Sequence, residues 1–336
     1  MAGFYCFGIE LEMVATPRDA SEAARYMRDA GTDDLKYHLE YYDELPPKGW
    51  QGWFITSDSS NLKDEHDELW RPPIVPLETV SGILETVGEY GRTWQEQIEY
   101  FWMAQSAIFH IPESSTTCGT HVHITPGPAR EWSLDQVKRI AIGIIRYKDQ
   151  IQRLLPAHRR STSSYDSNST FSSVFEDGSA PGQRHANKYL RRNSDSTEDI
   201  REVFRRPSPA RAFNLSRPAR VAALAYEMNR MADMAAIVGV IQDDRRALWN
   251  FANLLQDKKT IEFRGGRGLR GPQRTKWCIA FVVGFVDFLM SMDADTHDEP
   301  ADANVKWLYA GIRWRAHENR CRDLSLNHEM FNETIP

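Results

Sequence analysis

The chain has 336 residues, of which 41% are hydrophobic and 26% are charged, and its formal net charge at pH 7 is -6. A chain of this size can bury a large core, either as one big domain or as two closely packed ones. Its negative charge argues against a general nucleic-acid-binding protein, so we expect no nucleic-acid partner.

The first predicted element is a strand at residues 8–12, with the sequence GIELE. Side chains alternate between the two faces of a strand, so Glu10 and Glu12 share one face while Ile9 and Leu11 point towards a core. The two glutamates also interrupt the only apolar stretch near the start, and no basic segment precedes it, which argues against a signal peptide. We therefore expect a cytoplasmic protein.

Three helix starts are predicted from capping boxes, in which two side chains three positions apart bind the first backbone amides of a helix. The boxes are Asp19 with Glu22, Thr93 with Glu96, and Ser133 with Gln136. The second helix carries the apolar residues Trp94, Ile98, Phe101, Trp102 and Phe109. The third runs through Ile140, Ile144, Ile145 and Ile151 to a stop at Pro156. Both helices are amphipathic, and we expect them to cover one face of a sheet.

Two further segments repeat the alternation of the first strand. Residues 119–123 (GTHVH) offer His121 and His123, and residues 260–264 (TIEFR) offer Glu262 and Arg264. Their core-facing neighbours are Val122, Ile124, Ile261 and Phe263. On adjacent strands, the three segments would gather three carboxylates, two imidazoles and a guanidinium, a set that suits a divalent cation together with an anionic ligand. Any one pair alone is more typical of a half-buried strand with one wet face.

The four cysteines, Cys6, Cys118, Cys278 and Cys321, show no CxxC spacing. This argues against a structural zinc site and favours a reducing compartment. Cys118 directly precedes the histidine strand, so a nucleophile is one interpretation. We favour a small buried residue, because unpaired cysteine is among the most buried residue types.

Near the C-terminus, the longest apolar run covers residues 277–290 and contains Asp287. It is shorter than the roughly 20 residues that a bilayer-spanning helix needs, so we expect a core helix and no membrane partner. Strands separated by helices and long excursions, without a regular βαβ rhythm, favour an α+β fold.

Five segments, taken in order, resemble the motifs of the amidoligase family: residues 7–12 (FGIELE), 53–59 (WFITSDS), 68–73 (ELWRPP), 118–123 (CGTHVH) and 260–264 (TIEFR). The family belongs to the carboxylate-amine ligase superfamily, with glutamine synthetase and glutamate-cysteine ligase. The resemblance implies a glutamine-synthetase-like antiparallel sheet with a concave active-site face, covered by helices. We expect one amidoligase-like catalytic domain over residues 1–336, with a helical C-terminal part at 271–336. Residues 157–217 are polar, serine-rich and locally basic, so they form either a disordered insertion or a functional lid. We favour a mobile lid, because arginines on a closing loop would hold a polyphosphate and exclude water.

The function that the resemblance implies is ATP-dependent, ADP-forming ligation, in which a carboxylate is phosphorylated and then captured by an amine. Two Mg²⁺ or Mn²⁺ ions are expected as cofactors. The superfamily pattern places Glu10, His121 and Glu262 around one ion, and Glu12 and Glu68 around the other. The partners would be a small-molecule or peptide carboxylate donor and an amine acceptor.

The same resemblance gives expected roles to further residues. His123 would lie near the nucleotide phosphates, and Arg264 would hold the substrate carboxylate or the transferred phosphoryl group. Asp58 would bind a metal or the amine.

The family often has an asparagine at the position of Asn250, so this residue is also expected to contact a ligand such as the nucleotide. The basic composition of the lid, and not the resemblance, makes Arg159 and Arg160 candidate nucleotide contacts. Arg267, which follows the third strand, is a further candidate.

Two alternatives remain open from the sequence. The same carboxylate and histidine cluster suits a metal-dependent hydrolase, because metal ligands alone do not distinguish activation of water from use of an amine. A catalytically inactive nucleotide-binding relative is the other alternative, and the presence of all three polar pairs argues against it.

Overall fold

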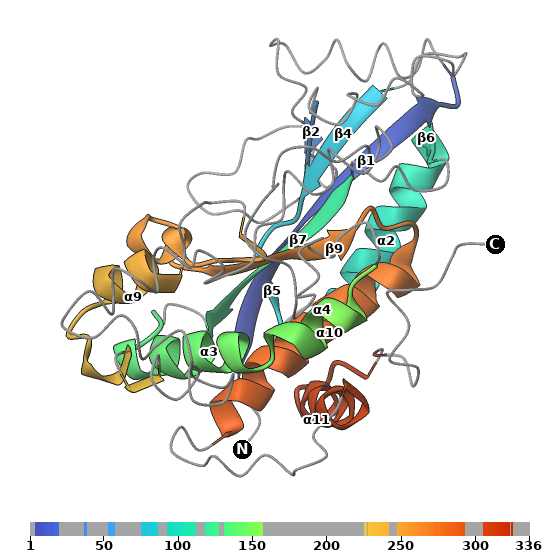
Figure 1. Cartoon of the computed structure of the whole chain (residues 1–336). Helices are drawn as coiled ribbons and strands as arrows, with labels where there is room; N and C mark the ends of the chain where they lie inside the picture. The colour runs from blue at the N-terminus through green and yellow to red at the C-terminus, as the bar shows by residue number, and fades with distance from the viewer. Residues whose placement is uncertain are drawn as a thin grey trace, which may run out of the picture.

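The structure is a computed structural model, and it describes residues 4–19, 37–38, 53–57, 75–86, 93–111, 118–127, 131–156, 225–226, 228–241, 247–292, 305–322 and 324. The predicted lid at 157–217 and all but the first residue of the capping box at Asp19 and Glu22 lie outside these residues. The described strands form an antiparallel sheet in the order β2-β3-β4-β1-β7-β9-β8, and β5 and β6 pair with the two ends of β1 (Figure 1). The α+β class and the antiparallel sheet are therefore confirmed.

The strands are β1 Tyr5–Pro17, β2 Tyr37–His38, β3 Phe54–Ser57, β4 Val75–Val80, β5 Leu84–Glu85, β6 Phe109–His110, β7 Gly119–Pro126, β8 Trp249–Asn250 and β9 Ile261–Arg267. The helices are α2 Trp94–Ile108, α3 Leu134–Arg146, α4 Lys148–Leu154, α9 Met234–Ile241, the 3₁₀ helix η4 Ala252–Leu255, α10 Pro272–Ser291 and α11 Val305–Glu318. None of the described helices has both the length and the apolarity to cross a membrane.

The core lies between one face of the sheet and the helices. The predicted inward residues of the three central strands, Ile9, Leu11, Val122, Ile124, Ile261 and Phe263, are all buried. Helix α10 packs against β7, α2 and α3, while α11 packs against α10 and α4 (Figure 1). Helices therefore cover the apolar face, and the alternate side chains point to the opposite, polar face.

The second and third predicted capping boxes are present, at the starts of α2 and α3. The structure differs from two of the predicted helices, in the end of the first and in the continuity of the second. Phe109 lies in β6, where it pairs with Pro17, because α2 ends at Ile108. The helix predicted to run to Pro156 is interrupted at Tyr147, whose φ of -95° and ψ of 10° separate α3 from α4.

A β-bulge interrupts the pairing of β7 with β9 opposite His121. Thr120 pairs with Gly266 and Val122 pairs with Phe263, so two residues of β9 lie opposite one residue of β7. A bulge of this kind puts two successive residues on the same face and shifts the alternation beyond it.

Two glycines make this bulge possible. A Cβ atom on Gly265 would lie 2.5 Å from Cζ of Phe263, and one on Gly266 would lie 2.7 Å from Cβ of Thr120. Both missing side chains would point towards the core, where there is no space for them. Arg267 consequently returns to the polar face, which an unbroken alternation from Glu262 would not allow.

Candidate functional site

The centre of the polar face is formed by β1, β7 and β9 (Figure 1). Glu10 is the register partner of His121, and His123 is the register partner of Glu262. The three predicted segments therefore lie on neighbouring strands, as the sequence indicated. Their charged side chains lie opposite the face that packs on α10.

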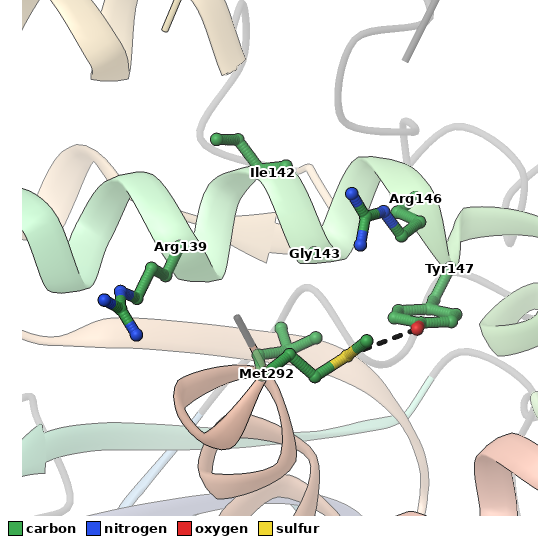
Figure 2. A pocket seen from close by; sticks show the side chains of 7 residues that line it. Arg139, Ile142, Gly143, Arg146, Tyr147 and Met292 are labelled. Atoms are coloured by element: carbon green, nitrogen blue, oxygen red, sulfur yellow. Dashed lines mark hydrogen bonds between the residues drawn. The ribbon is translucent and has the colours of Figure 1, made fainter. Parts of the chain in front are cut away.

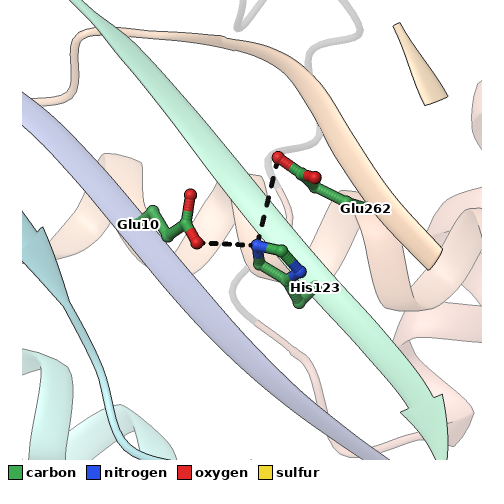
Figure 3. A group of neighbouring side chains, drawn as sticks. All are labelled: Glu10, His123 and Glu262. Atoms are coloured by element: carbon green, nitrogen blue, oxygen red, sulfur yellow. Dashed lines mark hydrogen bonds and ion pairs between the residues drawn. The ribbon is translucent and has the colours of Figure 1, made fainter. Parts of the chain in front are cut away.

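Glu10, His123 and Glu262 point towards one another (Figure 3). Nε2 of His123 lies 2.9 Å from Oε1 of Glu10 and 3.9 Å from Oε1 of Glu262. One ligand atom from each residue can be chosen so that all lie within 4.8 Å of one another. Two carboxylate oxygens and an imidazole nitrogen that converge in this way fit a divalent cation such as Mg²⁺ or Mn²⁺. We call these three residues the ligand cluster.

His121 lies between the ligand cluster and Glu12. Its Nδ1 is 3.1 Å from Oε2 of Glu10 and 3.7 Å from Oε1 of Glu262, and its Nε2 is 3.6 Å from Oε1 of Glu12. The structure thus brings both imidazoles to Glu10. The division of roles between them, with His121 on the metal and His123 near the nucleotide, stays a prediction.

The two carboxylates of the ligand cluster favour their ionised forms. Burial would raise the pKa of Glu10, but hydrogen bonds with His121 and His123 and the charges of these imidazoles hold that pKa well below its ordinary value. Burial also opposes ionisation of Glu262. The positive charge of Arg264, followed by the charges of the two histidines, outweighs the effect of burial and lowers the pKa of Glu262. At neutral pH both side chains are therefore negative, as a cation site requires.

Glu262 is held by two asparagine side chains. The side-chain nitrogens of Asn250 and Asn253 donate to Oε2 of Glu262 at 2.8 Å and 3.1 Å. The amide of Ala252 donates to Oδ1 of Asn250 at 3.0 Å, which fixes the orientation of that side chain. Oε1 of Glu262 is therefore the oxygen that faces the histidines. Asn250 was expected to contact the nucleotide, and in the structure it contacts Glu262.

Both predicted arginines of β9 lie on the polar face. Arg264 forms an ion pair with Oε1 of Glu262, and 25% of its side-chain surface is exposed. Arg267 is buried and pairs in register with Gly119, whose amide donates to Oε2 of Glu12 at 2.6 Å. Arg264 therefore contacts the ligand cluster, whereas Arg267 pairs with the residue whose amide binds Glu12.

Glu78 is a candidate that the sequence analysis missed. It is the register partner of Glu12 on the neighbouring strand β4, and it is half-buried. Ser81 fixes this register, because its amide donates to the carbonyl of Ile9 at 2.9 Å and its hydroxyl accepts from the amide of Ile9 at 2.9 Å. The available signal was alternation in β4, where Leu77 is buried and Glu78 faces the other way.

Four predicted site residues lie outside the described residues: Asp58, Glu68, Arg159 and Arg160. Asp58 directly follows β3, which pairs with β4. The expected roles of all four residues stay predictions.

A hollow lies on the helical layer, between α3 and the C-terminal end of α10 (Figure 2). Arg139 and Arg146 flank it, and the hydroxyl of Tyr147 donates to the sulfur of Met292 at 3.2 Å. Gly143 lies against Leu289 at its base, where an added Cβ would be 2.4 Å from a methyl carbon. None of the predicted site residues lines this hollow, so it is separate from the polar face.

The family of this chain is shown by a comparison with models of known protein families. Residues 4–286 match the model of the family described as "Putative amidoligase enzyme". The chain belongs to this amidoligase family. All three strands of the ligand cluster fall inside the matched range, and membership indicates a ligase-type enzyme. The comparison with curated proteins found no match.

Proposed function

We propose that the protein is an ATP-dependent carboxylate-amine ligase that forms an amide or isopeptide bond through an acyl phosphate. The observation that carries this proposal is the convergence of Glu10, His123 and Glu262 in a protein of the amidoligase family. The glutamine-synthetase-like fold inferred from the resemblance is part of the same proposal.

The residues of the ligand cluster would hold one Mg²⁺ or Mn²⁺ ion. Glu10 and Glu262 supply ionised oxygens, and an imidazole supplies nitrogen. Asn250 and Asn253 keep Oε1 of Glu262 directed at the site. When bound, such a cation neutralises charge on the phosphates during phosphoryl transfer.

A second ion would lie between β1 and β4. Glu12 and Glu78 are register partners there, so one cation could contact both carboxylates. Glu68 remains a predicted ligand of the same ion, outside the described residues. Together the two sites would give the pair of metal ions that phosphoryl-transfer enzymes commonly use to hold ATP.

The arginines would position the acid and stabilise developing negative charge. A guanidinium can hold a carboxylate or a phosphoryl group through two parallel hydrogen bonds, which fixes its orientation. Arg264 is accessible enough for this role once a cation shares Oε1 of Glu262. Arg267 pairs in register with Gly119, whose amide binds Glu12, and would contribute a second positive charge.

The fate of one oxygen atom tests the reaction. In the proposed chemistry, an oxygen of the carboxylate attacks the γ-phosphorus of ATP and ADP leaves. The amine then displaces phosphate, so that oxygen leaves as part of inorganic phosphate. Acids labelled with ¹⁸O in the carboxylate, beginning with glutamate, would be incubated with ATP, Mg²⁺ and a panel of amines. Mass spectrometry should find labelled phosphate in proportion to the amide formed.

An Arg264→Lys variant serves as the internal comparison, because a point charge cannot reproduce the two parallel hydrogen bonds of a guanidinium. It should lose label transfer and amide formation together. Release of AMP and pyrophosphate, or phosphate without label, would overturn the acyl-phosphate mechanism. Hydrolysis of an amide without consumption of ATP would instead favour the metal-dependent hydrolase.

A further inference from the structure

The turn between η4 and β9 brings a lysine to the ligand cluster. Residues 256–259 form this turn, which is closed by a hydrogen bond of 3.3 Å from the amide of Lys259 to the carbonyl of Gln256. Lys259 has a φ of 51°, which reverses the chain direction. Nζ of Lys258 lies 3.6 Å from Oε1 of Glu10.

Two other contacts hold the ends of the same segment against the cluster. At one end, Asn253 in η4 donates to Glu262 at 3.1 Å. At the other end, Oγ1 of Thr260 lies 3.1 Å from Nδ1 of His123. The residues before and after Lys258 are thus fixed to two members of the ligand cluster, and the lysine is carried by the turn between them.

Lys258 differs from Glu10 in its access to water. Its side chain is 57% exposed, whereas that of Glu10 is 13% exposed. A long exposed lysine loses little when it moves, because water replaces its partner and its stem has several rotamers. Glu10 has no such freedom, since His121 and His123 also contact its two oxygens.

The ammonium group and a divalent cation would compete for one atom. Oε1 of Glu10 is the oxygen that Lys258 approaches, and it is also the oxygen nearest to Nε2 of His123. A cation bound there would carry twice the charge of the ammonium and repel it. The displaced ammonium would remain beside the site, held by the turn.

We propose that Lys258 is a counterion that a divalent cation displaces from Glu10, and that the freed ammonium then binds the phosphoryl or carboxylate group of the substrate. The inference rests on the proposed function, because it needs a cation at Glu10. In this proposal Lys258 affects both the affinity of the site for a divalent cation and its affinity for an anionic substrate group. A lysine suits this double role because it acts as a mobile point charge, where an arginine fork would hold one geometry.

The two effects have opposite signs, and this makes the proposal testable without a known substrate. The variant Lys258→Gln removes the competitor, so Mn²⁺ should bind more tightly by about twofold to fivefold, the upper part of the range for an exposed ion pair. In the Mn²⁺-saturated protein, the same variant should bind inorganic pyrophosphate or glutarate more weakly by a similar factor. Calorimetric titration measures both quantities.

Two further variants serve as controls. Lys259→Gln makes the same change of charge on the same turn, and it should alter both affinities less than about twofold. Lys258→Arg keeps the charge, and its affinity for Mn²⁺ should stay within about twofold of the wild type. Loss of pyrophosphate binding alone would assign Lys258 to a phosphoryl group, and loss of glutarate binding alone would assign it to a carboxylate.

Two failures can be told apart. Wild-type protein that binds no Mn²⁺ would overturn the metal site and the role of Lys258 together. Wild-type protein that binds Mn²⁺ with an affinity that Lys258→Gln leaves unchanged or weakens would overturn the role of Lys258 alone. If Lys258→Gln and Lys259→Gln changed the two affinities equally, the effect would come from the net charge of the turn and not from the position of Lys258. That result would also overturn the proposal.

Discussion

Glu12 of β1 and Glu78 of β4 are direct register partners on neighbouring antiparallel strands. Side chains in such pairs lie about 5 Å apart at Cβ, close enough for one cation to contact both carboxylates. The pair therefore extends the ligand cluster across a further strand and gives the second proposed ion a place in the sheet.

The first prediction concerns the number of ions bound. If Glu12 and Glu78 share the second ion, Glu78→Gln should reduce Mn²⁺ binding from two ions to one, because an amide is a much weaker ligand than a carboxylate. Equilibrium dialysis or paramagnetic resonance of Mn²⁺ measures the stoichiometry. Glu131→Gln, at an exposed position, is the matched change of charge. Two ions bound by Glu78→Gln would contradict the assignment.

The second prediction is a dependence of stability on pH. The pKa of Glu262 is lower in the folded protein than its ordinary value of 4.5, so folding favours the ionised form. The stabilisation is present above about pH 4.5 and is lost as pH falls through the lower, folded-state pKa. Glu262→Gln should therefore be less stable than the wild type at pH 7, and the difference should shrink as the pH is lowered.

Urea unfolding of the metal-free protein between pH 7 and pH 3 would measure this difference. Glu131→Gln again supplies the control, with a difference that should vary little over the same range. If the difference in the free energy of unfolding between wild type and Glu262→Gln grew towards low pH, the prediction would be contradicted. Repulsion among the carboxylates would then exceed the attraction of Arg264 and the histidines for Glu262.

The third prediction compares two glycines. Gly265→Ala should destabilise the fold by about 1–3 kcal/mol, because its Cβ would lie 2.5 Å from Phe263 and 2.7 Å from Leu248. Gly239→Ala, in α9, has no atom within 4 Å of the new Cβ and should stabilise the protein by about 0.5–1 kcal/mol through helix propensity. Denaturant unfolding of both variants is the measurement. If Gly265→Ala changed the free energy of unfolding in the same way as Gly239→Ala, the packing around the bulge would be loose and the prediction wrong.

The fourth prediction concerns the cysteines, all of which are buried. Burial, with a contribution from Glu85, raises the pKa of Cys6 to about 11, and burial raises that of Cys278 to about 12. A disulfide-exchange reagent at pH 8 should therefore react slowly with the native protein and with four thiols after unfolding. A native thiol that reacts as fast as free cysteine would reopen a nucleophilic role for Cys118.

Alternation of side chains was enough to predict the central strands. Glu10, His123 and Glu262 each have apolar neighbours on both sides, so period two identified the strand and its polar face together. Burial in the structure confirms those faces. The order of the five segments pointed to the family, and the match over residues 4–286 confirms the family.

Other parts of the site depend on contacts that the local sequence does not express. Gly265 and Gly266 lie inside β9, and the bulge that they allow is defined only by the pairing of this strand with β7. Asn253 binds Glu262 from a 3₁₀ helix, a placement set by tertiary packing. Glu78 was missed because the acidic family motif was assigned ten residues earlier, at Glu68.

The bulge in β9 also limits how the strand can change during evolution. Arg267 reaches the polar face through one additional residue, and deletion of either glycine would turn its side chain towards Cys278 and the core. Substitutions at most positions of this strand change one contact, whereas a change of length moves every later residue to the other face. In relatives that retain the reaction, the number of residues between Glu262 and Arg267 should therefore vary less than their identities.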